Sequence, residues 1–274
     1  MKTLALLLAL AAPDAPAAPG PDGQADVPAS PSGEAPICTD RPTKSNFACT
    51  VPEGRFQIET DVAFHSVQRG GATRADVTLF TNPTFKYGVG RSTDIEANIA
   101  PLLRVRSRAD GVATRREGVG DLTLRVKRRL TPADRPVQFA LIPYVKAPTA
   151  GRGVGNREWE GGLIAPANIS LPQGFTLTLV PQLDFLLDAD GRGRHVQFQQ
   201  VVNLGRQIAP DLTLYGELWT ARNFDPAGTV RQYSADAALA WLATPTLQLD
   251  GGANVGLNRA TPDAQVYLGV STRF

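Results

Sequence analysis

Apolar and polar residues alternate with a period of two along most of this chain, from Arg55 onward. In residues 175–188, for example, the odd positions are apolar and most even positions are Thr, Gln or Asp. This alternation is typical of β-strands with one apolar and one polar face. Turn-forming runs such as GVGRS and DADGRG separate successive segments. The twelve segments predicted in this way cover residues 55–66, 74–87, 93–106, 118–130, 137–148, 158–171, 175–188, 195–205, 211–222, 230–243, 246–258 and 264–274.

The length of these segments favours a membrane protein. Strands of soluble sandwiches average about five to six residues, whereas membrane-spanning strands need about nine to eleven. The predicted segments run to about eleven to fourteen residues, and their polar faces carry many charges. A membrane barrel turns its apolar face to lipid and keeps a polar lumen. The sequence therefore predicts an all-β fold, a transmembrane antiparallel β-barrel of about twelve strands with short turns.

Aromatic residues of the apolar parity fall near strand ends, at two heights. One group lies at the ends that would share one membrane surface: Phe56, Phe85, Tyr87, Phe139, Phe175, Trp241 and Phe274. The second group lies at the opposite ends: Phe64, Trp159, Phe185, Phe198 and Tyr233. Two aromatic girdles are expected where a barrel wall meets the two membrane interfaces.

The region before the strands predicts export. Residues 1–18 have a basic start, an apolar stretch and small residues, as in a secretory signal peptide, and residues 19–36 are a Pro/Ala-rich linker expected to be disordered. Residues 37–53 hold the two cysteines, Cys38 and Cys49. In an exported chain an isolated pair is most simply a disulfide, with two unpaired thiols as the alternative. The barrel then covers residues 54–274.

Charge and strand count bound the partners and the location. The net charge of +2 gives no reason to expect a nucleic acid, and we expect no metal and no cofactor because no phosphate loop or metal-ligand cluster stands out. An even number of strands puts both termini on one side. For a bacterial outer-membrane barrel that side is the periplasm, where the linker and the disulfide loop are also expected.

Four stretches of the barrel region resemble a known family. They are GRFQIETDVAF, GVGRSTDIEANI, GVGDLTLRVKRRL and QFALIPYVKAPTAGRGVGN, and TDRPTKS precedes them. Together they are similar to the outer-membrane proteins of the meta-pathway of phenol degradation family, also named simply transporters, over about residues 39–274. The resemblance implies a barrel in the outer membrane of a Gram-negative bacterium and the uptake of small, often aromatic compounds. It supplies no binding residues.

Parity counted back from Phe274 assigns the polar face to the lumen. The charged or amide residues predicted to line it are Glu59, Asp61, Glu96, Asn98, Asp121, Arg125, Lys127, Lys146, Glu160, Asp184, Glu217, Asp236 and Asp250. These side chains either pair and fill a narrow barrel or line a wet path that selects ions by sign. The aromatic residues predicted to face inward are Tyr144, Tyr215, Trp219 and Tyr267, which either stack on an aromatic solute or simply pack the lumen. We expect a narrow, partly obstructed pore.

Two further sets of residues mark the ends of the barrel and its wall. The loops opposite the termini carry Arg69, Arg74, Arg108, Arg115, Arg116, Arg152, Arg157, Arg192 and Arg194. These arginines are either solvated loop charges or contacts to lipopolysaccharide phosphates. Five prolines fall inside predicted strands: Pro83, Pro101, Pro143, Pro166 and Pro181. Because proline lacks an N–H for the ladder, they predict bulges or a weak seam in the wall.

The sequence favours passive transport of small solutes, with aromatic or hydrophobic compounds among them, through a narrow polar lumen. Two rival functions remain. One rival is a structural or adhesive barrel without a pore, and the other is an outer-membrane hydrolase. We expect no enzyme, because His65 and the adjacent Ser66 face opposite ways on a strand and His195 has no serine near it. The partners expected are the lipid bilayer, lipopolysaccharide, the solute and the barrel-assembly machinery, which would read Phe274 in the strand that closes the barrel.

Overall fold

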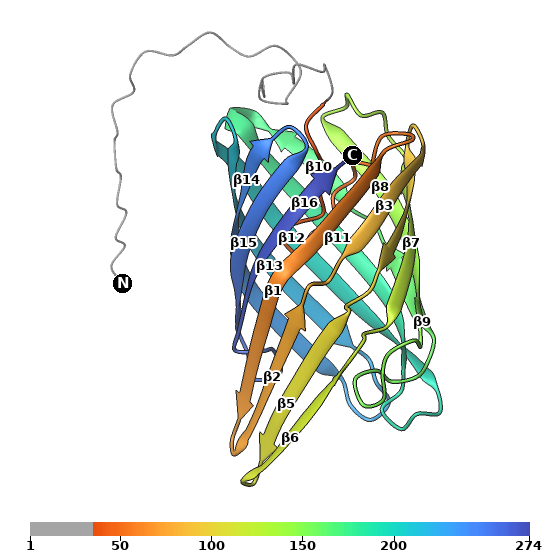
Figure 1. Ribbon diagram of the computed structural model, residues 1–274, viewed down its shortest axis with the longest axis vertical. Helices are drawn as coiled ribbons and strands as arrows, with labels where there is room; N and C mark the ends of the chain where they lie inside the picture. The colour runs from red at the N-terminus through yellow and green to blue at the C-terminus, as the bar shows by residue number, and fades with distance from the viewer. Residues whose placement is uncertain (1–34) are drawn as a thin grey trace, which may run out of the picture.

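The computed structural model describes residues 35–274, which form a barrel of β-strands (Figure 1). The predicted signal peptide (1–18) and the predicted linker (19–36), except its last two residues, lie outside the described residues. Within residues 35–274, no helix is long and apolar enough to cross a membrane. A single turn of 3-10 helix, η1 (Pro172–Gly174), connects two strands.

Sixteen strand segments build the wall. In chain order they are β1 (Phe56–Gly70), β2 (Thr73–Phe80), β3 (Thr84–Gly90), β4 (Thr93–Asn98), β5 (Leu102–Ala109), β6 (Val112–Gly118), β7 (Leu122–Arg129), β8 (Val137–Ala147), β9 (Glu160–Ile164), β10 (Ala167–Leu171), β11 (Phe175–Leu187), β12 (Arg194–Ala209), β13 (Leu212–Asn223), β14 (Val230–Thr244), β15 (Leu247–Gly256) and β16 (Ala264–Arg273).

These segments make twelve barrel strands, because β2–β3, β4–β5, β6–β7 and β9–β10 are each one strand with a short break. All neighbours are antiparallel, and β16 pairs with β1 from Arg273 opposite Gln57 to Ala264 opposite Val67, which closes the barrel. Closure removes both sheet edges at this seam. The predicted twelve-stranded antiparallel barrel is therefore confirmed.

Burial alternates along the strands as a membrane barrel requires. Leu218 and Leu268 are 59% and 64% exposed, whereas Asn203 and Ser271 are fully buried. Apolar side chains thus cover the outer surface, and polar side chains fill the interior. We call the barrel end that holds residue 35 and Phe274 the near rim and the opposite end the far rim.

Three of the five strand prolines coincide with breaks in the wall. Pro83, Pro101 and Pro166 lie in the gaps between β2 and β3, β4 and β5, and β9 and β10. At Pro143 and Pro181 the pairing continues, with Leu163 and Gln200 as their partners. The wall is therefore interrupted mainly between β2 and β10, where the missing N–H groups fall.

A β-bulge in β1 reverses the faces predicted for the far half of this strand. The register between β1 and β16 shifts between Asp61 and Ala63. Phe64 pairs with the buried Tyr267, so Phe64 faces the lumen, whereas His65 pairs with the exposed Val266. The prediction that Phe64 belongs to an outer girdle is wrong, because one extra residue moves every later side chain to the other face.

The same reversal passes to the neighbouring strands. Leu79 pairs with Phe64 and Leu103 pairs with Leu79, so both face inward, and Arg104 faces outward. By position, Leu103 and Val105 have the parity of the outward Ile95 in the predicted segment 93–106, but they face inward because the break at residues 99–101 changes the parity. The far part of β1 with β2, β5 and β6, here called the far sheet, projects beyond the rest of the barrel (Figure 1). Residues 112–117, which lie between two predicted segments and belong to a predicted loop, form most of its last strand.

Candidate functional site

A polar segment of the chain lies inside the barrel. Residues 37–52, here called the plug, enter at the near rim and lead into β1 (Figure 1). Cys38 and Cys49 are joined in a disulfide that closes this segment into a loop. Ser45 and Ala48 are 1% and 0% exposed, although the plug has no regular secondary structure. The predicted disulfide is present, and its loop, expected on the side of the termini, enters from the end that holds residue 35 and Phe274 but lies within the lumen.

Lumen carboxylates supply the hydrogen bonds that an irregular buried segment needs. Arg41 forms ion pairs with Asp61 at 2.6 Å and with Asp250 at 2.8 Å, on opposite sides of the β1–β16 seam. Lys44 pairs with Asp236 at 2.5 Å, and its backbone N–H donates to Glu217 at 3.0 Å. Buried backbone and charged groups must be paired, which explains the many acids on the lumen wall.

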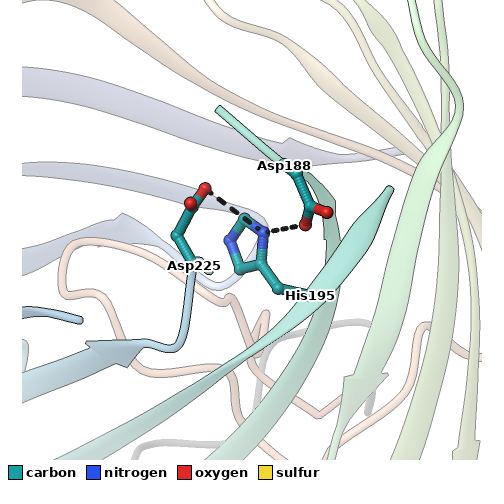
Figure 2. A group of neighbouring side chains, drawn as sticks. All are labelled: Asp188, His195 and Asp225. Atoms are coloured by element: carbon teal, nitrogen blue, oxygen red, sulfur yellow. Dashed lines mark hydrogen bonds and ion pairs between the residues drawn. The ribbon is translucent and has the colours of Figure 1, made fainter. Parts of the chain in front are cut away.

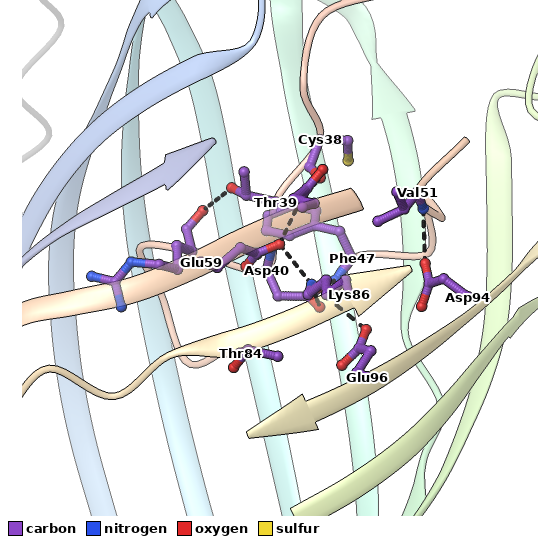
Figure 3. A network of polar contacts seen from close by, with 12 residues as sticks. Cys38, Thr39, Asp40, Phe47, Val51, Glu59, Thr84, Lys86, Asp94 and Glu96 are labelled. Carbon is purple, nitrogen blue, oxygen red and sulfur yellow. Dashed lines mark hydrogen bonds and ion pairs between the residues drawn. The ribbon is translucent and has the colours of Figure 1, made fainter. Parts of the chain in front are cut away.

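One acid on the plug, Asp40, meets two lysines of the wall, of which Figure 3 shows Lys86. The Asp40 carboxylate accepts from Lys86 at 2.5 Å and from Lys127 at 2.6 Å. Both lysines are almost fully buried, and Glu59 and Glu96 also contact them. Since charges buried in this way are stable only when paired, this cluster fixes the plug to β3 and β7.

Close backbone approach also holds the plug. Gly269 of β16 lies against the guanidinium of Arg41, and Gly88 of β3 lies against the carbonyl of Pro52. A Cβ at either glycine would collide with the plug. Small residues are therefore required where the plug touches the wall.

The structure brings most of the predicted lumen residues into two groups. Those that contact the plug or its ion cluster are Glu59, Asp61, Glu96, Lys127, Glu217, Asp236 and Asp250. Those nearer the far rim are Asp121, Arg125, Lys146, Glu160 and Asp184. Asn98 lies apart and donates to the break between β2 and β3, at Asn82 and Thr84. The two groups correspond to the plugged and the open part of the lumen.

Cavities lie on both sides of the plug. The far cavity, of about 420 Å³, is lined by Lys44, Asn46, Thr123, Arg125, Tyr144, Lys146, Glu160, Ile164, Gln182, Leu186, Gln199, Val201 and Trp219. The near cavity, of about 560 Å³, lies on the near-rim side, where Cys38, Phe47 and Tyr215 are among its lining residues. The predicted aromatic residues are therefore divided between them, and Tyr267 instead stacks under Arg41. The plug separates the two cavities of one lumen.

A carboxylate–histidine cluster lies at the far rim (Figure 2). The Nδ1 atom of His195 is 2.9 Å from Asp188 and 3.5 Å from Asp225, which joins the 188–194 hairpin to the 224–229 loop. Asp225 also accepts the backbone N–H groups of Ala227 and Ala189, at 2.7 and 2.8 Å. The hydrogen bond from Ala227 lowers the pKa of Asp225 most. Burial opposes this shift, and the bond from Ala189 and the charge of His195 add to it.

The lowered pKa gives a testable pH dependence of these loops. A carboxyl whose pKa is lowered in the folded state stabilises it above the ordinary value of 3.8 and loses this effect as the pH falls through the lowered value. Pepsin cleavage within the two loops is expected to stay slow from pH 5 to about 4 and to quicken below that. Asp225→Asn should be cleaved rapidly throughout this range. Asp190→Asn in the same hairpin is the matched control, and equal cleavage of both variants would contradict the role of Asp225.

His65 has a hydroxyl and a carboxylate beside it on the outer face of the far sheet. Its Nδ1 atom is 3.0 Å from Thr78 Oγ1, and its Nε2 atom is 3.6 Å from Asp76. This resembles the order of a catalytic triad, but Arg74 binds both oxygens of Asp76, at 2.7 and 2.8 Å. A carboxylate held by arginine cannot orient and stabilise the imidazolium as a triad acid does. The group therefore fits a polar outer surface better than a nucleophilic site.

Comparison with known proteins identifies the family. Residues 39–274 match the family model described as "Putative MetA-pathway of phenol degradation". The chain belongs to this family. The predicted resemblance to the phenol-degradation family is thus confirmed over nearly the whole described chain. A search of curated protein sequences gave no match.

Solved structures similar to this phenol-degradation family member are outer-membrane barrels. An outer membrane channel from Pseudomonas putida F1 is 17% identical, with a TM-score of 0.67, over 85% of this chain and 100% of that chain. The NanC porin is 9% identical, with a TM-score of 0.52, over 79% of this chain and 98% of that chain. The β domain of the Bordetella autotransporter BrkA is 12% identical, with a TM-score of 0.51, over 80% and 98% of the two chains. At these identities the likeness shows the outer-membrane barrel fold alone.

One feature of this family member's lumen could not be inferred from the alternation. Ile142, Ile164, Val180 and Val201 form a buried apolar cluster on the inner wall, with Tyr144 and Trp219 packed against it. Val180 has the parity of the polar face in its strand. An apolar residue at such a position was the one hint in the sequence that part of the lumen wall is apolar. The lumen is therefore polar at the plug and partly apolar beside the far cavity.

Proposed function

We propose that this barrel conducts small organic solutes passively across the outer membrane and that the plug is the main obstruction to their passage. One observation carries the proposal: a lumen with a cavity on each side is closed between them by an irregular segment held through ion pairs. Ion pairs and single hydrogen bonds can be exchanged with water and solute far more readily than a strand ladder can be opened. The plug therefore supports a narrow path rather than a solid core.

We propose that the near rim, with residue 35 and Phe274, faces the periplasm and that the far rim lies at the cell surface. The exposed aromatic residues at the near rim, Phe56, Tyr87, Trp241 and Phe274, support an interface at this height. Phe274 stacks on Phe56 across the closing seam. A solute would then enter by the far cavity and leave by the near cavity.

Swelling of proteoliposomes tests the transport function. Purified protein in liposomes should admit small solutes at a rate that falls with solute size, with protein-free vesicles as the control. A barrel with a structural or adhesive role would give no flux for any solute. A hydrolase would release fatty acid from phospholipid or lipopolysaccharide, and such release without flux would decide for that rival.

We also propose that the outer face of the far sheet binds lipopolysaccharide phosphates. Arg69 lies directly opposite Arg74, and Arg74 lies opposite Arg108 on the next strand. Arg106 likewise pairs with Arg115. Like charges directly opposite each other destabilise a sheet, so this arrangement favours a polyanion that bridges them. Arg116, which was expected to belong to this set, lies on the inner face opposite Val105.

Charge removal on this face should weaken lipopolysaccharide binding and spare the fold. In the described part of the chain, Arg106 and Arg108 have no carboxylate partner, so Arg106→Gln with Arg108→Gln removes anion-binding charge without breaking an ion pair. We expect several-fold less lipopolysaccharide bound per barrel, measured by phosphate content after reconstitution. Arg128→Gln with Arg206→Gln, two outward arginines at the near rim, is the matched control. Equal loss in both double variants would contradict a specific surface.

A further inference from the structure

The far cavity combines an apolar wall with a cationic wall. On one side lie Ile164, Val201 and Leu186, beside the rings of Tyr144 and Trp219. This wall continues the buried apolar cluster, in a lumen whose other inward side chains are mainly polar. Ligand pockets of about 300 to 1,000 Å³ are usually lined by apolar and aromatic groups with a few placed polar ones. The volume of about 420 Å³ and the lining fit a small ligand with an apolar body.

The cationic wall consists of Lys44, Arg125 and Lys146, with Glu160 as the one acid among the lining residues of the described chain. The two lysines are already paired. Lys44 contacts Asp236 at 2.5 Å, and Lys146 contacts Glu160 at 2.9 Å. These pairs compensate the two lysine charges and fix their positions, and Lys146 also contacts Asp121 at 3.1 Å.

Arg125 differs from both lysines. Its nearest carboxylate oxygen, on Glu96, is 3.8 Å away, and Glu96 is shared with Lys86 and Lys127. In residues 35–274 its guanidinium donates no hydrogen bond, and its Nε atom is buried without a partner. Buried donors are normally satisfied, and a guanidinium presents a planar fork that matches a carboxylate. The guanidinium of Arg125 therefore has donors available to an anion in the cavity.

The acid nearest to the apolar wall does not compete for such a ligand. Asp184 accepts from Tyr144 at 2.5 Å, from Gln182 at 2.7 Å and from Gln199 at 2.6 Å. These neutral donors satisfy its oxygens and stabilise its charge, and it is almost fully buried. An anion in the cavity therefore meets cations and amide donors rather than a free carboxylate.

We propose that the far cavity binds a small organic anion with an apolar ring, of the class of monocyclic aromatic carboxylates. The carboxylate accepts from Arg125, and the ring packs against Tyr144, Trp219 and Ile164. This inference rests on the proposed transport function and names the solute class that the path would take. A neutral hydrocarbon leaves Arg125 without an acceptor, and a small inorganic anion leaves the apolar wall in water.

Calorimetric titration of the purified barrel tests the site with benzoate as the probe, at neutral pH. Benzyl alcohol supplies the ring without the charge, and acetate supplies the charge without the ring. Benzoate is expected to bind more tightly than either. Arg125→Gln should weaken benzoate binding about tenfold or more and leave benzyl alcohol unchanged, since it removes a charged hydrogen bond. Arg128→Gln, on the outer face of the same strand, should change neither.

Arg125→Lys separates recognition from folding, because it keeps the charge and loses the planar fork, so weakened benzoate binding is expected here too. Benzoate that binds no better than acetate, or an Arg125→Gln variant that behaves like Arg128→Gln, overturns the inference. Vesicle swelling by an uncharged solute distinguishes the two proposals. Flux without benzoate binding retains the transport function and rejects the site, whereas binding without flux of any solute retains the site and rejects transport.

Discussion

Replacing Asp40 by Asn is expected to increase strongly the frequency of large open events in single-channel recordings. The substitution removes the charge that Lys86 and Lys127 contact at 2.5 and 2.6 Å. Breaking a buried ion pair by removing one partner costs about 3 kcal/mol at the lower end of the known range. The lower end applies here because Glu59 stays within 2.6 Å of Lys86. A cost of this size shifts the ratio of displaced to docked plug about a hundredfold.

Asp134→Asn is the matched control for this variant. Asp134 is an exposed acid in the loop between β7 and β8, at the rim where the plug enters. The wall ladder does not depend on Asp40, so both variants should keep the barrel's heat-modifiable migration in gels. Identical recordings for Asp40→Asn, Asp134→Asn and the unmodified protein would show that the plug does not limit conduction.

The sequence predicts the wall well because a barrel strand is a local pattern. A period of two in residues such as 175–188 needs no knowledge of the neighbouring strands. The turn residues between segments set the number of strands, and strand length separates a membrane barrel from a sandwich. The fold class and the lumen face of β3, β4 and β11 to β16 follow from these local signals alone.

The errors arise where one residue changes the register. Val62 and Phe64 are both apolar and two positions apart, so the bulge beside them leaves the alternation intact to a reader of the sequence. The break at residues 99–101 has the same effect, since Leu103 and Val105 continue the parity of Ile95. Only the pairing with β16 and β2 shows that these side chains face the lumen.

The plug was missed for a different reason. Residues 37–52 are polar and lack a period, which indicates a loop but not its place. Its position is decided by partners far along the chain, such as Asp250 for Arg41 and Glu217 for Lys44. The surplus of lumen acids was visible in the sequence, and an excess of buried carboxylates implies a missing set of donors. That excess was the one available signal for an internal segment.

Deletion of the plug is expected to convert the barrel into a cation-selective channel of much larger conductance. Without residues 37–52, six lumen acids lose the donors that the plug supplies: Glu59, Asp61, Asp94, Glu217, Asp236 and Asp250. Lys86 and Lys127 remain as the main opposing charges at this height, and rings of carboxylates attract cations. Reversal potentials in a potassium chloride gradient measure the selectivity.

Adding Glu217→Gln, Asp236→Asn and Asp250→Asn to the deletion should reduce the cation selectivity, because these three acids lie on the side of the lumen away from the lysines. A deletion variant that prefers anions would mean that the two lysines dominate the field, and the acids would then serve only to hold the plug.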